Sequence, residues 1–392
     1  MRYFYIKDGD AVDQVRRIAA GQVDRSGPDA FICDFILSHA NDDLLVAGVW
    51  DARDRFSFGR VRAEGYNNVS RIGLRRLKRL WIALRVFFLV WRWKPDRIVC
   101  ACTEEALASC VLVAKVLGVP IVQSLHNELQ RRGGPWRLIA SLDRASIRAC
   151  DAAVCHGPFL AAEIKSLGVP ARLVHDFEVD LSGFAAAATN AKLPPQFEAF
   201  AARHPLILLF SGRVQQNKGV FDLLEAFRSL VAAGDEQLGL VYIGSGSDLE
   251  PLRQRVAELS FGDRVLVAGK LTHAELPGVM SIAAVTVTPT RPEFPEGRCM
   301  VVIESLVLGV PVVAPDNGPF PYAIQNDVNG YLYEPGNVEA LRAALARIIR
   351  EPQVRARLRQ GSLVSRDQLL TKQKTFSDAV EAAFVAAKAE RR

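Results

Sequence analysis

The sequence predicts an α/β protein built from two domains with parallel sheets, and three observations lead to this prediction. The chain has 392 residues, which is enough for two domains of ordinary size. Hydrophobic residues make up 49% of the chain and charged residues 23%, which is typical of a globular protein. Short apolar runs alternate with helix-length amphipathic segments, as expected for parallel strands joined by helices.

In the first half, this alternation is clearest after residue 94. Strands are predicted at 95–102 ("PDRIVCAC"), 119–126 ("VPIVQSLH") and 150–157 ("CDAAVCHG"). A helix is predicted at 104–118, because its apolar residues recur at helical spacing and the segment ends at a glycine.

The second half repeats the pattern. Helices are predicted at 219–234 and 301–309, and strands at 205–212, 238–246, 264–269, 283–290 and 310–316. Residues 183–204 are rich in small residues and contain "LPP", which indicates a linker and the start of a second domain. The predicted domains are therefore 1–183 and 184–365, and residues 366–392 are predicted to form a C-terminal helix that packs back toward the first domain.

Several turns after the predicted strands of the second half carry glycines and charges. Examples are "SGRVQQNKG", "IGSGSD", "AGKLTHAEL" and "PTRPEFPEGR". Ligands of doubly wound parallel sheets bind beyond the carboxyl ends of the strands. The sequence therefore predicts that these loops hold one phosphorylated ligand.

The first of these turns contains Gly212, Arg213 and Lys218. Gly212 permits close approach of the backbone to a ligand. The two cations are five residues apart and are predicted to bind one diphosphate, with solvated surface charges as the alternative. Gly244 in the next turn is predicted to line the same site, and the alternative is a tight turn without ligand contact.

Two carboxylates, Glu296 and Glu304, lie eight positions apart, and an apolar run surrounds Glu304. If a helix begins near Met300, its dipole favours Glu304 by only about 0.3–1 kcal/mol. A buried carboxylate without partners costs several kcal/mol, so Glu304 needs hydrogen-bond donors. Ribose hydroxyls are the predicted donors, and a buried arginine is the alternative. Glu296 is predicted to accept hydrogen bonds from sugar hydroxyls, and the backbone amides of Gly297 to Met300 to face phosphate.

The seven cysteines show neither metal-binding nor paired spacing. They are predicted to be free thiols in a reducing cytosol. Cys299 lies at a predicted helix N-terminus, where a thiol pKa can be lowered. It is predicted to be a packed small residue, with a nucleophilic role as the alternative. The first residues lack the long apolar core of a secretory signal.

Residues 71–94 carry eight basic residues and no acidic one. Their longest apolar run has six residues, whereas a membrane-spanning helix needs roughly 18–20. The C-terminal part of the segment is predicted to pack on a sheet. The N-terminal part is predicted to be either a solvated helix face or a docking site for anionic lipid, and its basic residues are Arg71, Arg75, Arg76, Lys78 and Arg79. Nucleic-acid binding is not expected, because no reader motif accompanies the charge.

Residues 205–350 resemble the donor half of retaining glycosyltransferases of family 4. The matching elements are "GRVQQNKG", the Glu-(seven residues)-Glu motif "EGRCMVVIE", "SLVLGVPVVA" and "NDVNGYLYEPGNVEALRAAL". The resemblance implies the GT-B architecture, in which two Rossmann-like parallel-sheet domains face a central cleft.

The resemblance also implies roles for the matching residues. Arg213 and Lys218 would bind the donor diphosphate. Glu296 would bind hydroxyls of the donor sugar, and Glu304 would bind the ribose. The remaining implied donor-binding positions are Lys270 and Leu271 at the edge of the base, and Arg298, Cys299 and Met300 at the sugar and phosphates.

The match is thinner in the first half. "VPIVQSLHNE" resembles the family's strand that ends in a histidine, so His126 would reach the donor sugar, and a role as catalytic base is a hypothesis. His156 and Gly157 stand where the family usually has a serine, and Glu178 replaces a glycine. The family's glycine-rich turn after the first strand is reduced to Gly9. The acceptor site therefore cannot be inferred by analogy.

The resemblance implies a retaining glycosyltransferase that uses a nucleotide-diphosphate sugar. The expected acceptor is a hydroxyl of a lipid-linked precursor, a surface polysaccharide or a glycolipid, and the alternative activity is a GT-B nucleotide-sugar epimerase. Catalytic roles are expected for Glu296, His126, Arg213 and Lys218. No cofactor and no essential metal are expected, because cations and helix-end amides would stabilise the leaving diphosphate. The expected location is the cytoplasm, including peripheral attachment to the inner membrane face.

Overall fold

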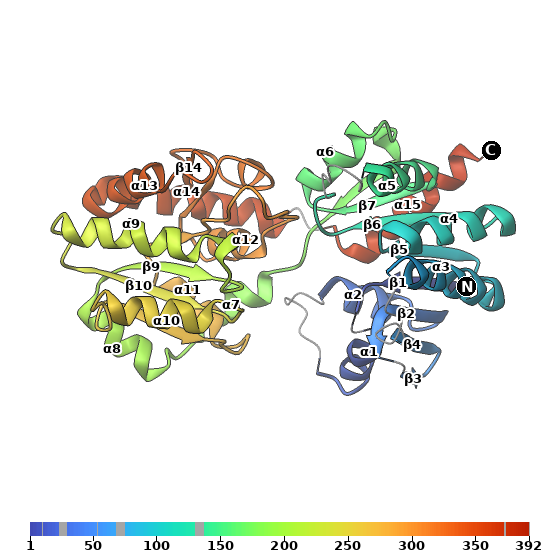
Figure 1. Cartoon of the computed structure of the whole chain (residues 1–392), viewed down its shortest axis with the longest axis horizontal. Helices are drawn as coiled ribbons and strands as arrows, with labels where there is room; N and C mark the ends of the chain where they lie inside the picture. Colours follow the sequence, from blue (N-terminus) through green and yellow to red (C-terminus); the bar gives the residue numbers. More distant parts are fainter. Residues whose placement is uncertain are drawn as a thin grey trace. The chain divides into compact units, whose positions relative to one another are not determined.

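The computed structural model divides the chain into two compact units, each with its own sheet (Figure 1). Unit 1 comprises Met1–Val179 and Gln373–Arg392, and unit 2 comprises Asp180–Lys372. The residues that the structure describes are 1–9, 11–22, 30–52, 54–67, 75–129, 137–371 and 374–391.

The described part of unit 1 contains an eight-stranded sheet with the order β3-β4-β2-β1-β5-β6-β7-β8. All neighbouring strands are parallel except β3 and β4, which are antiparallel. Its strands are β1 (Arg2–Lys7), β2 (Asp43–Ala52), β3 (Arg55–Phe58), β4 (Val61–Asn67), β5 (Arg97–Ala101), β6 (Ile121–Leu125), β7 (Ala152–His156) and β8 (Val174–Phe177).

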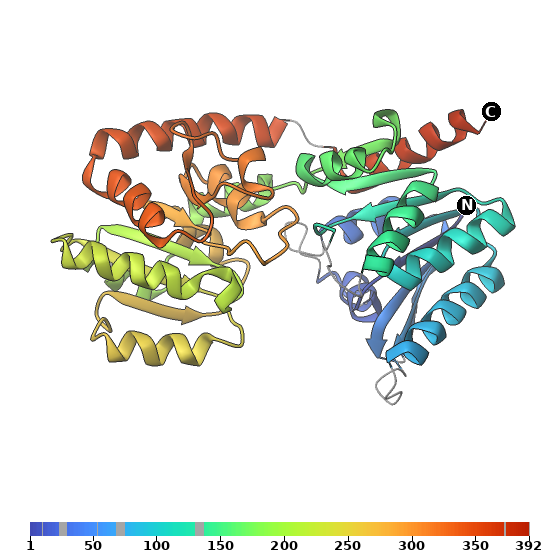
Figure 2. The same ribbon diagram turned by 45° about the horizontal axis from the view of Figure 1, so that its top comes forward.

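Helices cover both faces of this sheet, so its inner strands are apolar on both sides. In β1, Phe4 and Ile6 face one core, whereas Tyr3 and Tyr5 face the other, as the two-residue period of a strand requires. The first core is covered by α3 (Arg75–Trp93), α4 (Glu104–Leu117), α5 (Arg137–Ala149) and α6 (Pro158–Ser166). The second is covered by α1 (Ala11–Ala19), α2 (Ala30–Ser38) and α15 (Phe376–Glu390), with the short helix η3 (Ala171–Leu173) beside them. Within the first layer, α3 and α4 run side by side (Figure 2).

Unit 2 contains a six-stranded parallel sheet with the order β11-β10-β9-β12-β13-β14. All residues of the inner strand β10 are buried, because helices again cover both faces. The strands are β9 (Leu206–Ser211), β10 (Leu238–Ile243), β11 (Val265–Gly269), β12 (Val285–Val287), β13 (Val312–Pro315) and β14 (Gly330–Tyr333).

One core of unit 2 lies under α9 (Val220–Ala232), α10 (Leu249–Glu258) and α13 (Val338–Arg350). α9 buries Val220, Leu223, Leu224, Phe227 and Leu230, which recur at helical spacing. The other helical elements are α7 (Ser182–Asn190), α8 (Pro195–Arg203), η4 (Gln216–Lys218), α11 (Leu276–Ser281), α12 (Met300–Val307), η5 (Phe320–Tyr322) and α14 (Pro352–Thr371).

Two predicted connections differ from the structure. Residues 183–204 are mostly helical rather than a linker, because Phe184, Phe197 and Phe200 anchor α7 and α8 in the interior. Residues 366–392 form two helices rather than one. The first part belongs to α14 of unit 2, and α15 begins anew after Thr375, whose side chain accepts a hydrogen bond from the Asp378 amide in a capping box.

The boundary between the units also lies slightly earlier than the predicted one. Unit 2 begins at Asp180, whereas the sequence predicted a start at residue 184. The difference arises because α7, which begins at Ser182, packs with α11 and α12 of unit 2. Among the helices that the structure describes, none is long and apolar enough to cross a membrane.

Candidate active site

The loops that follow β9 and β10 are each hydrogen-bonded through their backbone to the end of the neighbouring strand. The amide of Gly212 donates to the Ile243 carbonyl at 3.0 Å, and the amide of Gly244 donates to the Gly269 carbonyl at 2.8 Å. Gly244 has a φ of 130°, and a Cβ there would lie 1.8 Å from the Gly212 carbonyl oxygen. The predicted glycine turn is therefore required by close packing of the loops, whether or not it also touches a ligand.

A second close approach places Lys218 beside the loop that follows β12. Gly219 has a φ of 71°, and a Cβ there would lie 1.9 Å from the Pro289 carbonyl oxygen. The Arg291 amide donates to the Asn217 carbonyl at 3.0 Å. The loop containing the predicted phosphate-binding cations is thus fixed against the loop containing Glu296.

Lys218 and Glu296 form an ion pair in which the Lys218 ammonium donates to Oε1 of Glu296. Their side chains are 14% and 11% exposed, so the pair is partly shielded from solvent. Thr290 Oγ1 donates to the same carboxylate oxygen at 3.0 Å. Both described hydrogen bonds thus fall on Oε1, which leaves the other oxygen, Oε2, as an acceptor for a ligand hydroxyl.

Phe294 lies beneath both predicted phosphate-binding cations. The Lys218 Nζ atom is 3.9 Å from the centroid of the Phe294 ring, and the Arg213 guanidinium carbon is 5.2 Å from it. A cation over an aromatic face is attracted by about 0.5–2 kcal/mol, depending on its solvation. The ring therefore helps to hold Arg213, which is exposed, near Lys218 and Glu296.

The loop that carries Phe294 is itself anchored to α9. The Arg291 guanidinium donates two hydrogen bonds to the Asp222 carboxylate, at 2.8 Å and 2.7 Å. The Phe294 amide donates to the Arg291 carbonyl at 3.0 Å, which closes a turn. A bidentate pair of this kind gives directional support as well as attraction.

Glu304 is the fifth residue of α12 and is half-buried, close to its predicted position just past the first turn. Arg298 is only 6% exposed. Burial raises the pKa of the Cys299 thiol well above its usual value, and the neighbouring charge of Glu296 adds to this effect, as Glu304 does to a smaller degree. A thiol with a raised pKa is a poor nucleophile, so Cys299 fits the packed role rather than the nucleophilic alternative.

The predicted base-edge residues follow β11. Lys270 is exposed and Leu271 is half-buried. Three buried side-chain oxygens follow other strands of the same sheet, namely Asn217 Oδ1, Thr288 Oγ1 and Asn317 Oδ1. None of these has a hydrogen-bond partner within the described ranges. Buried polar atoms are normally paired, so they are available to hydrogen-bond a ligand.

His126 lies in unit 1, directly after β6. Its Nε2 atom is 2.8 Å from Ser124 Oγ, and its ring stacks on Phe31 with the centroids 4.2 Å apart. The Nδ1 atom is buried and has no hydrogen-bond partner among the residues described. Burial, assisted by the charge of Lys7, lowers the pKa of His126 to about 3. An imidazole with so low a pKa is neutral at pH 7 but only weakly basic, which favours a hydrogen-bonding role over a role as general base.

The predicted lipid-binding cluster is only partly described. Arg71 lies outside the described residues. Arg75, Arg76, Lys78 and Arg79 belong to the first turns of α3, and their side chains are also outside what the structure describes.

The structure thus brings Arg213, Lys218 and Glu296 together in unit 2, and places His126 in unit 1. Sequence reasoning missed Phe294 and Thr290. The available signal for Phe294 was an aromatic residue framed by two prolines in "PEFPEG", next to the predicted sugar-binding glutamate. Within the described ranges, no group of three or more His, Cys, Asp or Glu side chains is placed to hold a metal ion.

Two family models match successive parts of the chain. Residues 196–362 match the glycosyl transferases group 1 model, and residues 43–175 match the glycosyltransferase family 4 model. The first match covers the Lys218–Glu296 cluster and the second includes His126.

Individual proteins agree with these models. The chain is 30% identical over 275 residues to a D-inositol 3-phosphate glycosyltransferase of Catenulispora acidiphila, a match that covers 64% of this chain and 63% of that protein. It is 24% identical over 261 residues to the alpha-D-kanosaminyltransferase of Streptomyces kanamyceticus, covering 64% and 67%. The matched stretch is thus no more than about two thirds of either relative.

The crystal structure of Anabaena HepE in complex with UDP has the same fold. The TM-score is 0.67, at 16% identity, and the comparison covers 100% of both chains. The two parallel sheets and the similarity to HepE show the GT-B fold. Together with the two family models and the glycosyltransferase relatives, they lead to one conclusion: the chain belongs to glycosyltransferase family 4.

Proposed function

We propose that this glycosyltransferase moves a sugar from a nucleoside-diphosphate sugar to a hydroxyl acceptor, with retention of the anomeric configuration and without an essential metal. The observation that carries the proposal is the cluster of Lys218, Glu296 and Arg213 around Phe294. It combines two cations with a carboxylate at the carboxyl edge of a parallel sheet. The same edge is where ligands of such sheets bind.

The two cations suit the leaving diphosphate. An ammonium has three N–H donors, so Lys218 can bond to Glu296 and still donate to a phosphate oxygen. Arg213 adds a planar fork that matches phosphate geometry. Together with the amides at the start of α12, they stabilise the negative charge that develops as the bond to the sugar breaks.

Glu296 is suited to position the transferred sugar. Lys218 and Thr290 hold its Oε1 atom, which fixes the carboxylate and leaves Oε2 for a sugar hydroxyl. Glu304, further along α12, is proposed to accept hydrogen bonds from the ribose. The acceptor proton passes to the leaving phosphate, so no protein base is required. His126, neutral at pH 7, is proposed to hydrogen-bond a substrate hydroxyl.

The relatives also bear on the alternative activity and the donor. The two relatives are both named as transferases, which does not favour a nucleotide-sugar epimerase. The HepE structure contains UDP, so a uridine diphosphate sugar is the first donor to test. The proposed acceptor is a lipid-linked or surface-polysaccharide precursor, and the proposed location is the cytoplasm with peripheral attachment to the inner membrane face.

The test begins with a thermal-shift screen of UDP-, GDP- and ADP-sugars, since a ligand that binds the native state raises the melting temperature. Turnover of the best donor is then measured for Lys218→Met and Glu296→Gln. Each is expected to lower kcat/KM by roughly 10²-fold or more. Glu293→Gln is the matched control, because Glu293 is exposed in the same loop and is expected to stay within about twofold of wild type.

Three further readouts complete the test. Chelation with EDTA is expected to leave turnover unchanged, and NMR of the product is expected to show the anomeric configuration of the donor. Accumulation of an epimerised nucleotide sugar without transfer would overturn the proposal. Equal losses in Glu293→Gln and Glu296→Gln would also argue against a specific role for the cluster.

A further inference from the structure

The outer side of α3 carries a row of exposed apolar side chains. Leu80, Leu84, Phe88 and Trp91 are 58%, 49%, 63% and 44% exposed. At 100° per residue, these positions fall within an arc of roughly 80° on one side of the helix. We call these four residues the apolar ridge.

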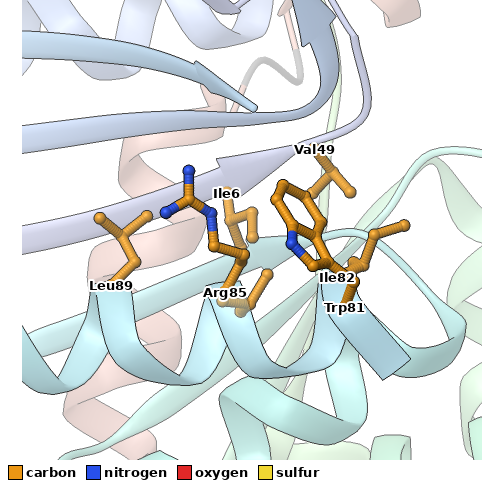
Figure 3. Close-up of a pocket in the computed structure, with 7 residues that line it drawn as sticks. Ile6, Val49, Trp81, Ile82, Arg85 and Leu89 are labelled. Carbon is orange, nitrogen blue, oxygen red and sulfur yellow. The ribbon is translucent and has the colours of Figure 1, made fainter. Parts of the chain in front are cut away.

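The opposite side of α3 is packed on unit 1. Ile82, Val86 and Val90 are buried in the core beneath the helix. In Figure 3, Trp81 extends from the flank of α3 toward the strand residue Val49, and Arg85 extends from the same flank toward the sheet, where it lines the same pocket as Ile6. The ridge is therefore not the core-facing stripe of the helix but a second apolar surface, on its solvent side.

The neighbouring helix extends this surface. On α4, Leu112 and Val116 lie one turn apart and are each 58% exposed. α3 and α4 pack side by side over the same core (Figure 2). Side chains of both helices that point away from the sheet are therefore exposed on the same side of unit 1. Exposed apolar patches that span neighbouring elements mark interaction surfaces, whereas single exposed residues need no explanation.

The charges around the ridge are basic. α3 has six basic residues and no acidic residue over its whole length. Arg85 and Arg92 are exposed and lie beside the ridge, and Lys115 is exposed on α4, where it also pairs with Asp151 at 3.4 Å. The nearest acidic residues of α4 are Glu104 and Glu105, which are half-buried in its first turn. The combination favours a partner that is apolar inside and anionic at its surface.

We propose that the outer surface of α3 and α4 docks this protein on an anionic lipid surface. The ridge enters the boundary between headgroups and acyl chains, where Trp and Phe are favoured. Arg92 keeps its charge among the lipid phosphates while its stem lies along the apolar side chains. The proposal differs from the predicted basic cluster at 71–79, since it places the apolar contact at Leu84 and Phe88. It rests on the peripheral attachment included in the proposed function, to which it assigns a surface, and it does not depend on the proposed glycosyl transfer.

The test is co-sedimentation with lipid vesicles. The full-length protein is mixed with vesicles of phosphatidylcholine alone, or of phosphatidylcholine with phosphatidylglycerol, and then centrifuged. The wild-type protein is expected to sediment with the anionic vesicles and much less with the neutral ones. Leu84→Glu combined with Phe88→Glu is expected to weaken binding by roughly tenfold or more, because two apolar contacts are lost and two negative charges are added.

The matched control introduces the same charges at exposed valines elsewhere. Val364 of α14 and Val385 of α15 are 51% and 67% exposed, and neither lies on the proposed surface. Val364→Glu combined with Val385→Glu is expected to bind vesicles as the wild type does. Thermal melting and nucleotide release in solution are measured for both double variants, so that a folding defect is distinguished from a loss of docking.

Several results would overturn the proposal. One is wild-type protein that remains in the supernatant with both kinds of vesicle, or that binds both equally. Another is a ridge variant that sediments like the wild type. A third is a wild-type dimer in size-exclusion chromatography that binds no vesicles and dissociates in the ridge variant, because this result would assign the ridge to a second copy of the chain.

Discussion

Replacing Glu381 by glutamine is expected to destabilise unit 1 by removing the centre of a polar network. Glu381, on α15, accepts hydrogen bonds from Arg97 at 2.7 and 2.9 Å and from the Tyr3 hydroxyl at 2.7 Å. His39 Nε2 lies 3.2 Å from the same carboxylate. The network joins α15 to β1, to β5 and to His39 just after α2, so it connects distant parts of the sequence within one unit.

The size of the effect follows from the acidity of Glu381. Burial alone would raise its pKa, but the hydrogen bonds from His39, Arg97 and Tyr3 outweigh burial and lower the pKa from 4.5 to about 2. At about 1.4 kcal/mol per pH unit, this pKa difference limits the contribution of ionised Glu381 to the free energy of unfolding to about 3.4 kcal/mol. The side chain is 39% exposed, so solvent screening reduces the expected loss in Glu381→Gln to about 1–2 kcal/mol.

The stabilisation from this network is expected to decrease both at low pH, through Glu381, and at higher pH, through His39. Since the folded-state pKa of Glu381 is depressed, its contribution is complete above pH 4.5 and is lost as the pH falls toward 2. For His39, burial opposes the charge, but hydrogen bonds to Glu381 and the Phe35 carbonyl raise its pKa above 6.5. Its contribution is complete below pH 6.5 and is lost as the pH rises through the folded-state value. The difference between wild type and variant is therefore expected to be largest between about pH 4.5 and 6.5.

Tryptophan fluorescence during urea unfolding measures this difference in the relevant unit, because all five tryptophans of the chain lie within Met1–Val179. Glu339→Gln is the control. Glu339 is 73% exposed and pairs with Arg342 on the surface of α13, so less than about 0.5 kcal/mol is expected. The reasoning fails if Glu381→Gln is as stable as wild type at pH 5.5, or if the loss is the same at pH 3.5 and pH 5.5.

Three other predictions concern the site. Phe294→Leu is expected to weaken binding of the donor nucleotide roughly five- to thirtyfold by calorimetry, through loss of two cation–π contacts; unchanged affinity would contradict this role. Gly244→Ala is expected to cost at least about 2 kcal/mol in thermal unfolding, because a Cβ would meet the Gly212 carbonyl, while Gly262→Ala, with open space around it, serves as the tolerant control. His126→Gln is expected to lower turnover without altering the pH profile between 5.5 and 8, and loss of an ionisation in that range would show that the imidazole titrates there.

The sequence predicted that Arg213, Lys218 and Glu296 share one site because these residues lie in two short loops. Arg213, Lys218 and Glu296 follow parallel strands, and the carboxyl ends of such strands share one edge of a sheet. The "PEFPEG" signal marked Phe294, but its position over the cations could not be predicted, because it depends on the bond from Arg291 to Asp222. This bond joins a loop to a helix 69 positions away. The low pKa of His126 depends on burial among aromatic residues from α2, β8 and α15, which no local pattern reveals.

The errors in the fold prediction have a similar origin. The alternation of strands and helices was visible because periodicity is local. Residues 183–204 were mistaken for a linker because their alanines and prolines dominate the composition, whereas three buried phenylalanines decide the structure. The same limitation applied to the C-terminal segment, where a cap at Thr375 separates two helices that belong to different units.

The return of the chain to unit 1 has a consequence for the order in which the protein folds during synthesis. Phe376, Val380 and Phe384 complete the core on one face of the first sheet, yet they follow the whole of unit 2 in the sequence and therefore leave the ribosome after it. Unit 2 has all of its strands and helices earlier and can close on its own. The sheet of unit 1, although synthesised first, therefore keeps one apolar face exposed until α15 has been made. A chain truncated before α15 would carry every strand but would be prone to aggregate and would depend on chaperones.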